Sequence, residues 1–265
     1  MSEEHQFIHL EAISKTFPGV ETGLTVLDQI DLSVGKRDFV SFVGHSGCGK
    51  STLLRIIAGL EPPTAGKLMI SGMSNEDYAS QVPLGFVFQD AALLPWKTLA
   101  ENVRLPLDIL GIETPAIRRT MVQRAIDLVR LTGFENLFPD HLSGGMRQRA
   151  SIARSLVYRP ELLLMDEPFG ALDDFTRREL SDELLRIWGE TACTVLFVTH
   201  SLPEAVLLSD RVVVLDNKPG RIREIVPIDL PRPRWADVRA SRAFADHLLH
   251  LESLIFGHRH HDQIS

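Results

Sequence analysis

The stretch that decides the fold reads FVSFVGHSGCGKSTLLRIIAGL and spans residues 39–60. Its first part, residues 39–43, is a short apolar run of the kind found in strands covered on both faces of a parallel sheet. Residues 52–60 repeat apolar side chains at helical spacing and stop before Pro62. A glycine-rich loop joins the two parts, so the stretch predicts a strand, a tight loop and a helix of an α/β fold.

The loop has the composition of a phosphate-binding site. The pattern G-x-x-x-x-G-K-[ST] is matched by Gly44, Gly49, Lys50 and Ser51. Positions without side chains let backbone N–H groups surround a phosphate, and the following helix points its positive end at the same anion. Lys50 can reach the outer phosphates of ATP, and the Ser51 hydroxyl can bind Mg²⁺. The predicted nucleotide-binding residues of the loop are Gly44, His45, Ser46, Gly47, Cys48, Gly49, Lys50, Ser51 and Thr52.

A second apolar run, ELLLMDEP at residues 161–168, ends in two carboxylates. A carboxylate at the mouth of a parallel sheet can contribute a second contact to Mg²⁺, and Asp166 stands there. Glu167 follows directly and points to the other side of the strand, where it could hold a water molecule. The alternative is that Asp166 and Glu167 are two solvated acids at a strand end. That interpretation would be preferred if the phosphate-binding loop were absent.

The stretch LSGGMRQR, residues 142–149, predicts a second anion-binding helix start. Ser143 suits the N-cap position, and Gly144 and Gly145 leave backbone amides exposed. One nucleotide has no room for two such cradles from one lobe, so we expect this one to serve the nucleotide of a neighbouring subunit. The alternative is an ordinary capped helix.

Together these motifs resemble the ATP-binding subunits of ABC-type transporters, over about residues 7–230. The resemblance implies that Phe17 stacks on adenine and that Gln89 contacts Mg²⁺ and the attacking water. It also implies that Glu167 is the general base and that His200 is the switch histidine near the γ-phosphate. The residue types alone leave other interpretations open. Phe17 could be a core residue of a hairpin, Gln89 a surface amide, and His200 a buried or capping histidine.

Several longer stretches are similar to the nitrate, sulfonate and taurine importers within that family. They indicate lineage better than cargo, because the cargo is bound by other subunits. These stretches are FVFQDAALLPWKTLAENVRLPL, MDEPFGALDDFTR, VTHSLPEAVLLSDRVVVL and the late LPRPR. Within the second of them, residues 171–173 resemble the D-loop that lies between subunits.

The resemblance implies a P-loop NTPase (RecA-like) α/β core with a small antiparallel β subdomain and an inserted helical subdomain. Residues 7–13 and 24–34 have strand patterns, and residues 98–158 have helical periodicity with few strand signals. We place the helical subdomain at about 90–158.

We predict a cassette over residues 1–230 and a C-terminal segment over 231–265. The segment combines a proline-rich link, a short amphipathic helix at 236–256 and a polar tail. The sequence HRHH at 258–261 could bind a metal, or it could be a frayed tail.

Composition narrows the classes of function. The 265 residues carry a net charge of −7, which argues against nucleic acid as the main partner. No apolar run is long enough for a membrane span, and acidic residues stand where a signal peptide carries positive charge. The two cysteines, Cys48 and Cys193, indicate a reducing compartment. Cys48 lies at a helix start, so we expect it either to react with thiol reagents or to be an inert small side chain.

These features predict a peripheral protein on the cytoplasmic face of the inner membrane. We expect a homodimer with each ATP between Lys50 of one copy and Ser143 of the other, bound to integral membrane permease subunits and indirectly to an extracytoplasmic solute-binding protein. Residues 91–96, ALLPW and its flank, are the predicted rim of the permease groove, or ordinary packing. The alternatives are an ABC-like ATPase outside transport, a module without hydrolysis, and an importer of a heterocyclic vitamin precursor.

Overall fold

The computed structural model describes residues 6–19, 23–111, 114–191, 193–234 and 236–257. The chain forms two compact units. The first contains residues 1–82 and 194–265, and the second contains residues 83–193. The second unit is therefore an insertion within the first, which extends the expected insertion beyond the helices themselves.

An antiparallel sheet of four strands opens the first unit, with the order β2-β1-β4-β5. Its strands are β1 (Gln6–Phe17), β2 (Leu24–Gly35), β4 (Ala65–Ile70) and β5 (Met73–Ser74). The long β1–β2 ladder contains register shifts. The short helix α2 (Asn75–Gln81) follows, and the Ser74 side chain caps it. This arrangement confirms the small antiparallel subdomain.

A second group of strands in the first unit surrounds β3 (Phe39–Gly44). The strands are β8 (Thr194–Val198), β9 (Arg211–Leu215) and β10 (Ile222–Pro227). β3 pairs in parallel with β8 and with β9, and β10 pairs antiparallel with β9. β3 and β8 consist of buried side chains along almost their whole length, as the continuous apolar runs predict.

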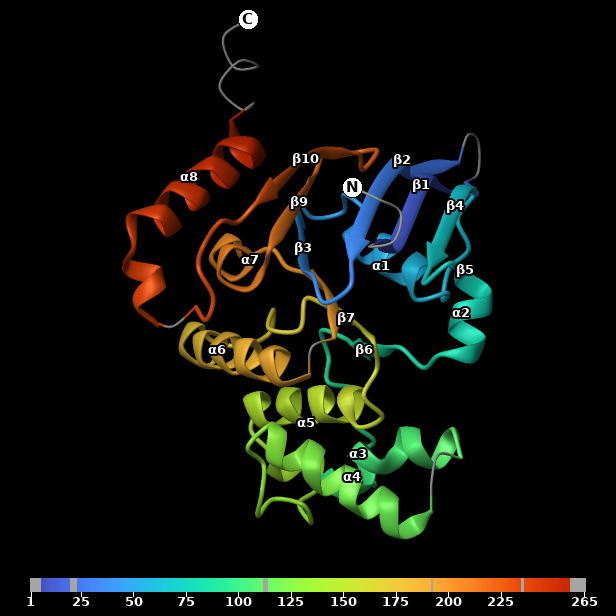
Figure 1. Cartoon of the computed structure of the whole chain (residues 1–265), viewed down its shortest axis with the longest axis vertical. Helices are drawn as coiled ribbons and strands as arrows, with labels where there is room; N and C mark the ends of the chain where they lie inside the picture. The colour runs from blue at the N-terminus through green and yellow to red at the C-terminus, as the bar shows by residue number, and fades with distance from the viewer. Residues whose placement is uncertain (1–5, 20–22, 112–113, 192, 235, 258–265) are drawn as a thin grey trace, which may run out of the picture. The chain divides into compact units, whose positions relative to one another are not determined.

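Helices cover this parallel group (Figure 1). They are α1 (Lys50–Ile57), α7 (Leu202–Leu208) and α8 (Arg242–Phe256). The 3₁₀ turn η3 (Ala236–Ala240) precedes α8. The expected single helix at 236–256 is two elements, because Ser241 begins a new helix by accepting a hydrogen bond from the Phe244 N–H at 3.2 Å. The end at 258–261, where one prediction placed a metal, lies outside the described residues.

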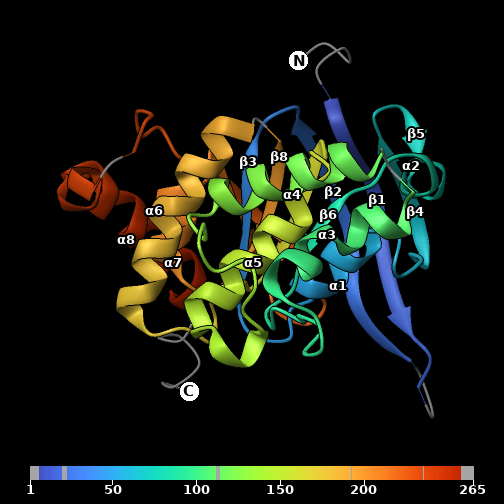
Figure 2. The ribbon, with the colours of Figure 1, turned by 90° about the horizontal axis from the view of Figure 1, so that it is seen from below.

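The second unit contains the parallel pair β6 (Gly85–Val87) and β7 (Leu162–Asp166). Its helices are α3 (Leu99–Ile109), α4 (Pro115–Leu128), α5 (Gly144–Leu156) and α6 (Asp174–Thr191), with the 3₁₀ turn η2 (Pro139–His141). Local sequence fixes two helix starts: Thr98 and Glu101 form a capping box, and Thr114 caps a helix that begins with proline. Figure 2 shows α3, α4 and α5 as a group of helices, which confirms the helical subdomain. Among the helices that the described residues form, none has the length and apolar character that a membrane span requires.

Candidate nucleotide-binding and hydrolysis residues

The phosphate-binding loop lies between β3 and α1 in the first unit, as predicted. A Cβ at Gly44 would lie 2.6 Å from the Leu215 carbonyl oxygen, and a Cβ at Gly49 would lie 2.6 Å from Leu27 Cδ2. Both glycines also have positive φ, 153° and 98°. They are therefore required for folding of the loop. Gly47 has a φ of 78°, and no described residue lies within 4 Å of its Cβ position, so this side of the loop is open to a ligand.

Lys50 folds back across the loop. Its side chain is buried, and Nζ donates to the carbonyl oxygens of Gly44 at 2.9 Å and His45 at 3.0 Å. No carboxylate among the described residues of this unit lies within 4.0 Å of Nζ. Nζ also donates to Cys48 Sγ at 3.8 Å, so each of the three donors of the ammonium group has a neutral partner within the loop. A buried cation whose partners in the loop are all neutral fits a terminal phosphate of a nucleotide.

The other residues of the loop differ in accessibility. Ser46 and Gly47 are exposed, and Ser51 and Thr52 are half-buried at the start of α1. Cys48 is fully buried, with its Sγ 3.8 Å from Lys50 Nζ. The expectation that Cys48 reacts with thiol reagents is therefore wrong for this conformation, because its sulfur is shielded. The inert alternative agrees with the structure.

The pairing of β3 with β8 places His200 at the same edge of the sheet as the phosphate-binding loop. Phe42 of β3 pairs with Val198 of β8, and both strands run in the same direction. Gly44 and His200 each follow two residues later, so they leave the same edge of the sheet side by side. A lone motif histidine thus lies next to the phosphate-binding loop.

The turn that carries His200 is held by hydrogen bonds of its two neighbouring residues. The Thr199 hydroxyl donates to Glu204 Oε2 at 2.6 Å and accepts from the Ser201 N–H at 3.0 Å. Ser201 in turn caps α7. His200 itself is exposed, so the alternative of a buried histidine is wrong.

Phe17 ends β1 and pairs with Leu24, which is 62% exposed. Phe17 is half-buried, and Lys15 Nζ lies 4.9 Å from the centre of its ring. The position is a strand end rather than the hairpin core, so the core interpretation of Phe17 is not supported.

In the second unit, the pairing of β6 with β7 likewise places Gln89 and Glu167 at the same edge of the sheet. Val87 of β6 pairs in parallel with Met165 of β7, and the two polar residues follow by two positions each. A Cβ at Gly170 would lie 3.2 Å from Gln89 Nε2 and 3.6 Å from Glu167 Oε2. The amide and the carboxylate therefore flank one point, and the absent side chain of Gly170 leaves room for both.

Glu167 has a strained backbone, with a φ of 46°. Non-glycine residues adopt such values rarely, and they concentrate at functional sites. The Glu167 carbonyl accepts from the Gly170 N–H at 3.0 Å, which closes the turn after β7. Asp166, the last residue of β7, is half-buried. The positive φ thus turns the chain at Glu167, directly after β7.

The start of α5 has the predicted cap. Ser143 is exposed, and its Oγ accepts from the Met146 N–H at 3.2 Å. Gly144 is half-buried, but Gly145 is buried, and a Cβ there would lie 2.9 Å from Thr176 Cγ2. Gly145 therefore does more than expose an amide, because it also lets α5 approach α6 closely.

Asp173 caps α6, a role that the sequence did not reveal. Its Oδ1 accepts from the N–H groups of Phe175 at 3.1 Å and Thr176 at 3.0 Å. The hydrogen bond from the Thr176 N–H lowers the pKa of the Asp173 carboxyl. The segment that resembles a D-loop is thus tied to the first turn of a helix.

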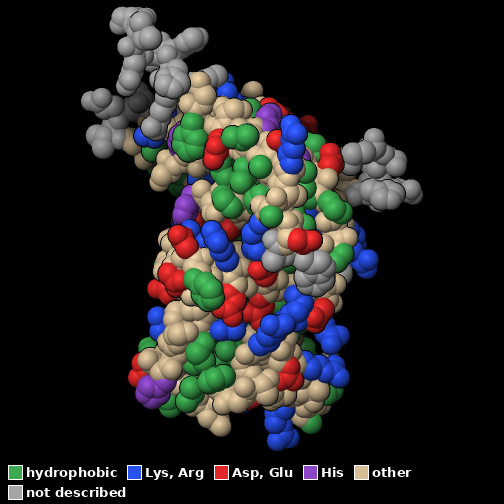
Figure 3. Space-filling view, turned by 90° about the vertical axis from the view of Figure 1, so that its left-hand side faces the viewer, with side chains coloured by type: hydrophobic (Ala, Val, Ile, Leu, Met, Phe, Trp, Pro, Cys, Tyr) green, Lys and Arg blue, Asp and Glu red, His purple; other side chains and the backbone are tan. Residues whose placement is uncertain are grey.

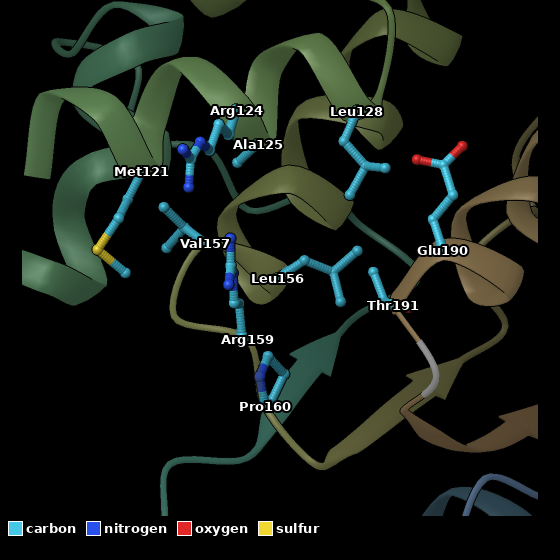
Figure 4. A pocket seen from close by; sticks show the side chains of 10 residues that line it. All are labelled: Met121, Arg124, Ala125, Leu128, Leu156, Val157, Arg159, Pro160, Glu190 and Thr191. Atoms are coloured by element: carbon cyan, nitrogen blue, oxygen red, sulfur yellow. The ribbon is translucent and has the colours of Figure 1, made fainter.

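A cavity of about 400 Å³ lies elsewhere in the second unit (Figure 4). None of the predicted nucleotide-binding residues lines it. Its lining residues are Met121, Arg124, Ala125, Leu128, Leu156, Val157, Arg159, Pro160, Glu190 and Thr191. The cavity is therefore separate from the predicted nucleotide-binding residues.

Comparison with known proteins agrees with the motifs described above. Residues 27–170 match the family model described as ABC transporter. The chain is 43% identical to a bicarbonate transport ATP-binding protein of Synechocystis sp., over 87% of this chain and 82% of the relative. It is 42% identical to a nitrate import ATP-binding protein of Synechococcus elongatus, over 89% and 87%. It is 45% identical to an aliphatic sulfonates import ATP-binding protein of Bacillus licheniformis, over 79% and 80%.

Among solved structures, the fold resembles the dimeric post-hydrolysis state of an ATP-binding cassette bound to ADP and inorganic phosphate. The TM-score is 0.74 at 32% identity, over 84% of this chain and 100% of that one. The sequence match, the phosphate-binding loop and the shared fold lead to one conclusion: the chain belongs to the ABC transporter family, as an ATP-binding subunit of the branch that resembles importers of small anions.

Proposed function

We propose that this chain hydrolyses ATP to drive import of a small inorganic or organic anion through a separate membrane permease. Similar proteins are named for bicarbonate, nitrate and aliphatic sulfonates, and these anions define the proposed class of solute. The observation that carries the proposal is Lys50, a buried ammonium whose hydrogen-bond partners are all neutral groups of an open glycine loop.

We assign the hydrolysis residues as follows. Lys50 and the amides of the loop bind the phosphates, and Phe17 stacks on adenine. Glu167 orients and deprotonates the attacking water, and His200 positions the terminal phosphate. Gln89 holds the water from the other side, which agrees with its amide and the Glu167 carboxylate flanking Gly170.

The proposed Mg²⁺ ligands are Ser51, Asp166 and Gln89. They supply a hydroxyl, a carboxylate and an amide oxygen, which is the hard oxygen donor set that Mg²⁺ prefers. When bound, the ion neutralises charge on the phosphates.

We further propose a homodimer in which Ser143, Gly144 and Gly145 of one copy bind the nucleotide held by Lys50 of the other. The similar cassette was solved as a dimer with ADP and phosphate, which supports this arrangement. Binding at a shared anion closes the pair, and hydrolysis removes the bridge. Permease subunits would bind near Trp96, which is 70% exposed, and would hold the chain at the cytoplasmic face of the membrane.

Mixing experiments test the shared site. Subunits with Lys50→Ala and subunits with Ser143→Ala are each expected to lose hydrolysis, since each homodimer has two defective sites. A mixture of the two contains heterodimers with one intact site, so part of the activity should return. If phosphate release from the mixture stays at the level of the single variants, the shared site is wrong. Uptake of labelled nitrate, bicarbonate and a sulfonate by vesicles with the permease then identifies the solute.

A further inference from the structure

The last turn of α8 contacts the phosphate-binding loop through His45. His45 Nε2 lies 3.0 Å from the Ile255 carbonyl oxygen. A carbonyl oxygen only accepts, so Nε2 carries the proton and donates. The ring of Phe256 packs edge-on against the imidazole, with centroids 5.9 Å apart and planes at 77°. A segment near the C-terminus therefore meets the loop that is proposed to hold ATP.

His45 also connects to the phosphate-binding lysine through its backbone. The His45 carbonyl accepts from Lys50 Nζ at 3.0 Å and from the Cys48 N–H at 3.3 Å. The side chain of His45 is thus fixed by α8 while its carbonyl fixes Lys50. A shift of the His45 backbone, which the contact of its side chain with α8 opposes, would move the carbonyl that orients the ammonium group.

α8 is held in place independently of His45. It packs on α7, with Phe244 and Leu251 buried. His250 Nε2 also lies 2.9 Å from Glu224 Oε1 on β10. Leu249 of α8 is 62% exposed. The face of the molecule that Figure 3 views carries hydrophobic side chains among charged ones. The helix is therefore a fixed point to which the loop is attached.

The link before α8 adds a second anchor. The Arg234 guanidinium is buried and donates to the carbonyl oxygens of Val206, Leu207, Ser209, Ile228 and Leu230. Three of these carbonyls lie in or just after α7, on which α8 packs. Arg234 and the packing of α8 on α7 thus both hold this part of the chain against the first unit.

We propose that α8 regulates nucleotide binding, with His45 as the positioning residue that transmits its effect to the phosphate-binding loop. This inference rests on the proposed ATPase function. While His45 is bonded to Ile255, the loop stays in the shape in which the carbonyl oxygens of Gly44 and His45 hold the Lys50 ammonium group. Release of the last turn of α8 loosens the loop, and nucleotide binding weakens because ordering must then occur on binding.

The test measures MgADP affinity by calorimetry on the full chain and on a chain that stops after Leu251. That truncation removes Ile255 and Phe256 but keeps both buried anchors of the helix. We expect a 3- to 10-fold weaker affinity, about the effect of one hydrogen bond of 1 kcal/mol. A chain that stops after Gly257 keeps the contact and serves as the matched control, with wild-type affinity expected.

A double-mutant cycle assigns the effect to the contact. His45→Ala should weaken affinity to a similar extent, and its combination with the truncation should add little. His45→Gln keeps an N–H donor and should recover most of the affinity. The KM for ATP should rise more than kcat falls. Circular dichroism at the assay temperature checks that each variant is folded.

The outcomes separate the two proposals. If the wild-type chain binds no nucleotide, the proposed function fails. If the wild-type chain binds MgADP but the Leu251 truncation binds it equally well, only the role of α8 is refuted. Fully additive effects of His45→Ala and the truncation would also refute it, because they would show that the two changes act separately.

Discussion

Replacing Arg234 by alanine should cost about 3–5 kcal/mol of unfolding free energy, the scale at which breaking a buried charged network destabilises a protein. The side chain is only 4% exposed. Its nitrogen atoms lie 2.6–3.3 Å from five carbonyl oxygens in two parts of the first unit. Burial lowers the pKa of Arg234 to about 10, so the group remains charged at neutral pH.

The magnitude follows from the groups that the substitution leaves behind. Each buried carbonyl without a partner costs about 1–3 kcal/mol, and water entering the cavity recovers part of that. The guanidinium also lies at the C-terminal end of α7, where a positive charge contributes up to about 2 kcal/mol. Against these terms stands the cost of burying the charge itself. Arg234→Lys should lose an intermediate amount, because three donors cannot satisfy five carbonyls.

Urea unfolding, followed by circular dichroism, measures the loss. Arg242→Ala is the matched control: its side chain is 95% exposed and its nearest carboxylate, on Asp246, is 3.8 Å away. A change within about 0.5 kcal/mol is expected for that surface pair. If Arg234→Ala loses less than about 1 kcal/mol, within the range of a single ordinary hydrogen bond, the guanidinium is not the anchor of this segment.

Three further predictions concern the site. Lys50→Ala should bind MgADP at least tenfold more weakly, because the buried ammonium group is lost. Unchanged MgADP affinity in calorimetry would refute the assignment of this loop as the phosphate-binding site. Glu167→Gln should bind MgATP but accumulate as a nucleotide-bound dimer in size-exclusion chromatography, whereas near-normal phosphate release would remove Glu167 from the role of base. Asp173→Ala should destabilise the chain more at pH 6 than at pH 3: the pKa of Asp173 is lowered by the Thr176 N–H, so its contribution is present above the unfolded pKa and is lost as the pH falls. Equal destabilisation at both pH values in urea would contradict that cap.

Elements with strong local patterns could be predicted from the sequence. The strand, loop and helix at 39–60 and the helical insertion have long apolar periods or motif glycines, and both are present. Helix α2 was not predicted, because its sequence NEDYASQ has no apolar period. It depends instead on the Ser74 cap and on the buried Tyr78. Strand β10 was also missed, since Val226 is the only buried residue within it.

Some features of the candidate site could likewise be predicted from the sequence, and others could not. The place of Lys50 in a phosphate-binding loop was predicted from its motif, whereas the role of His200 was predicted from the family resemblance. The positive φ of Glu167 and the contact between His45 and α8 could not be predicted, since both depend on how distant segments pack. Such contacts carry no local signal in the sequence.

The order of strands around β3 has a consequence for how the protein is made. β3 emerges early from the ribosome, but both of its neighbours, β8 and β9, are encoded after the whole inserted unit. Non-local pairing of this kind must wait for the late segments. The sheet around β3, from whose edge the phosphate-binding loop leaves, therefore cannot be complete until these late segments have been synthesised.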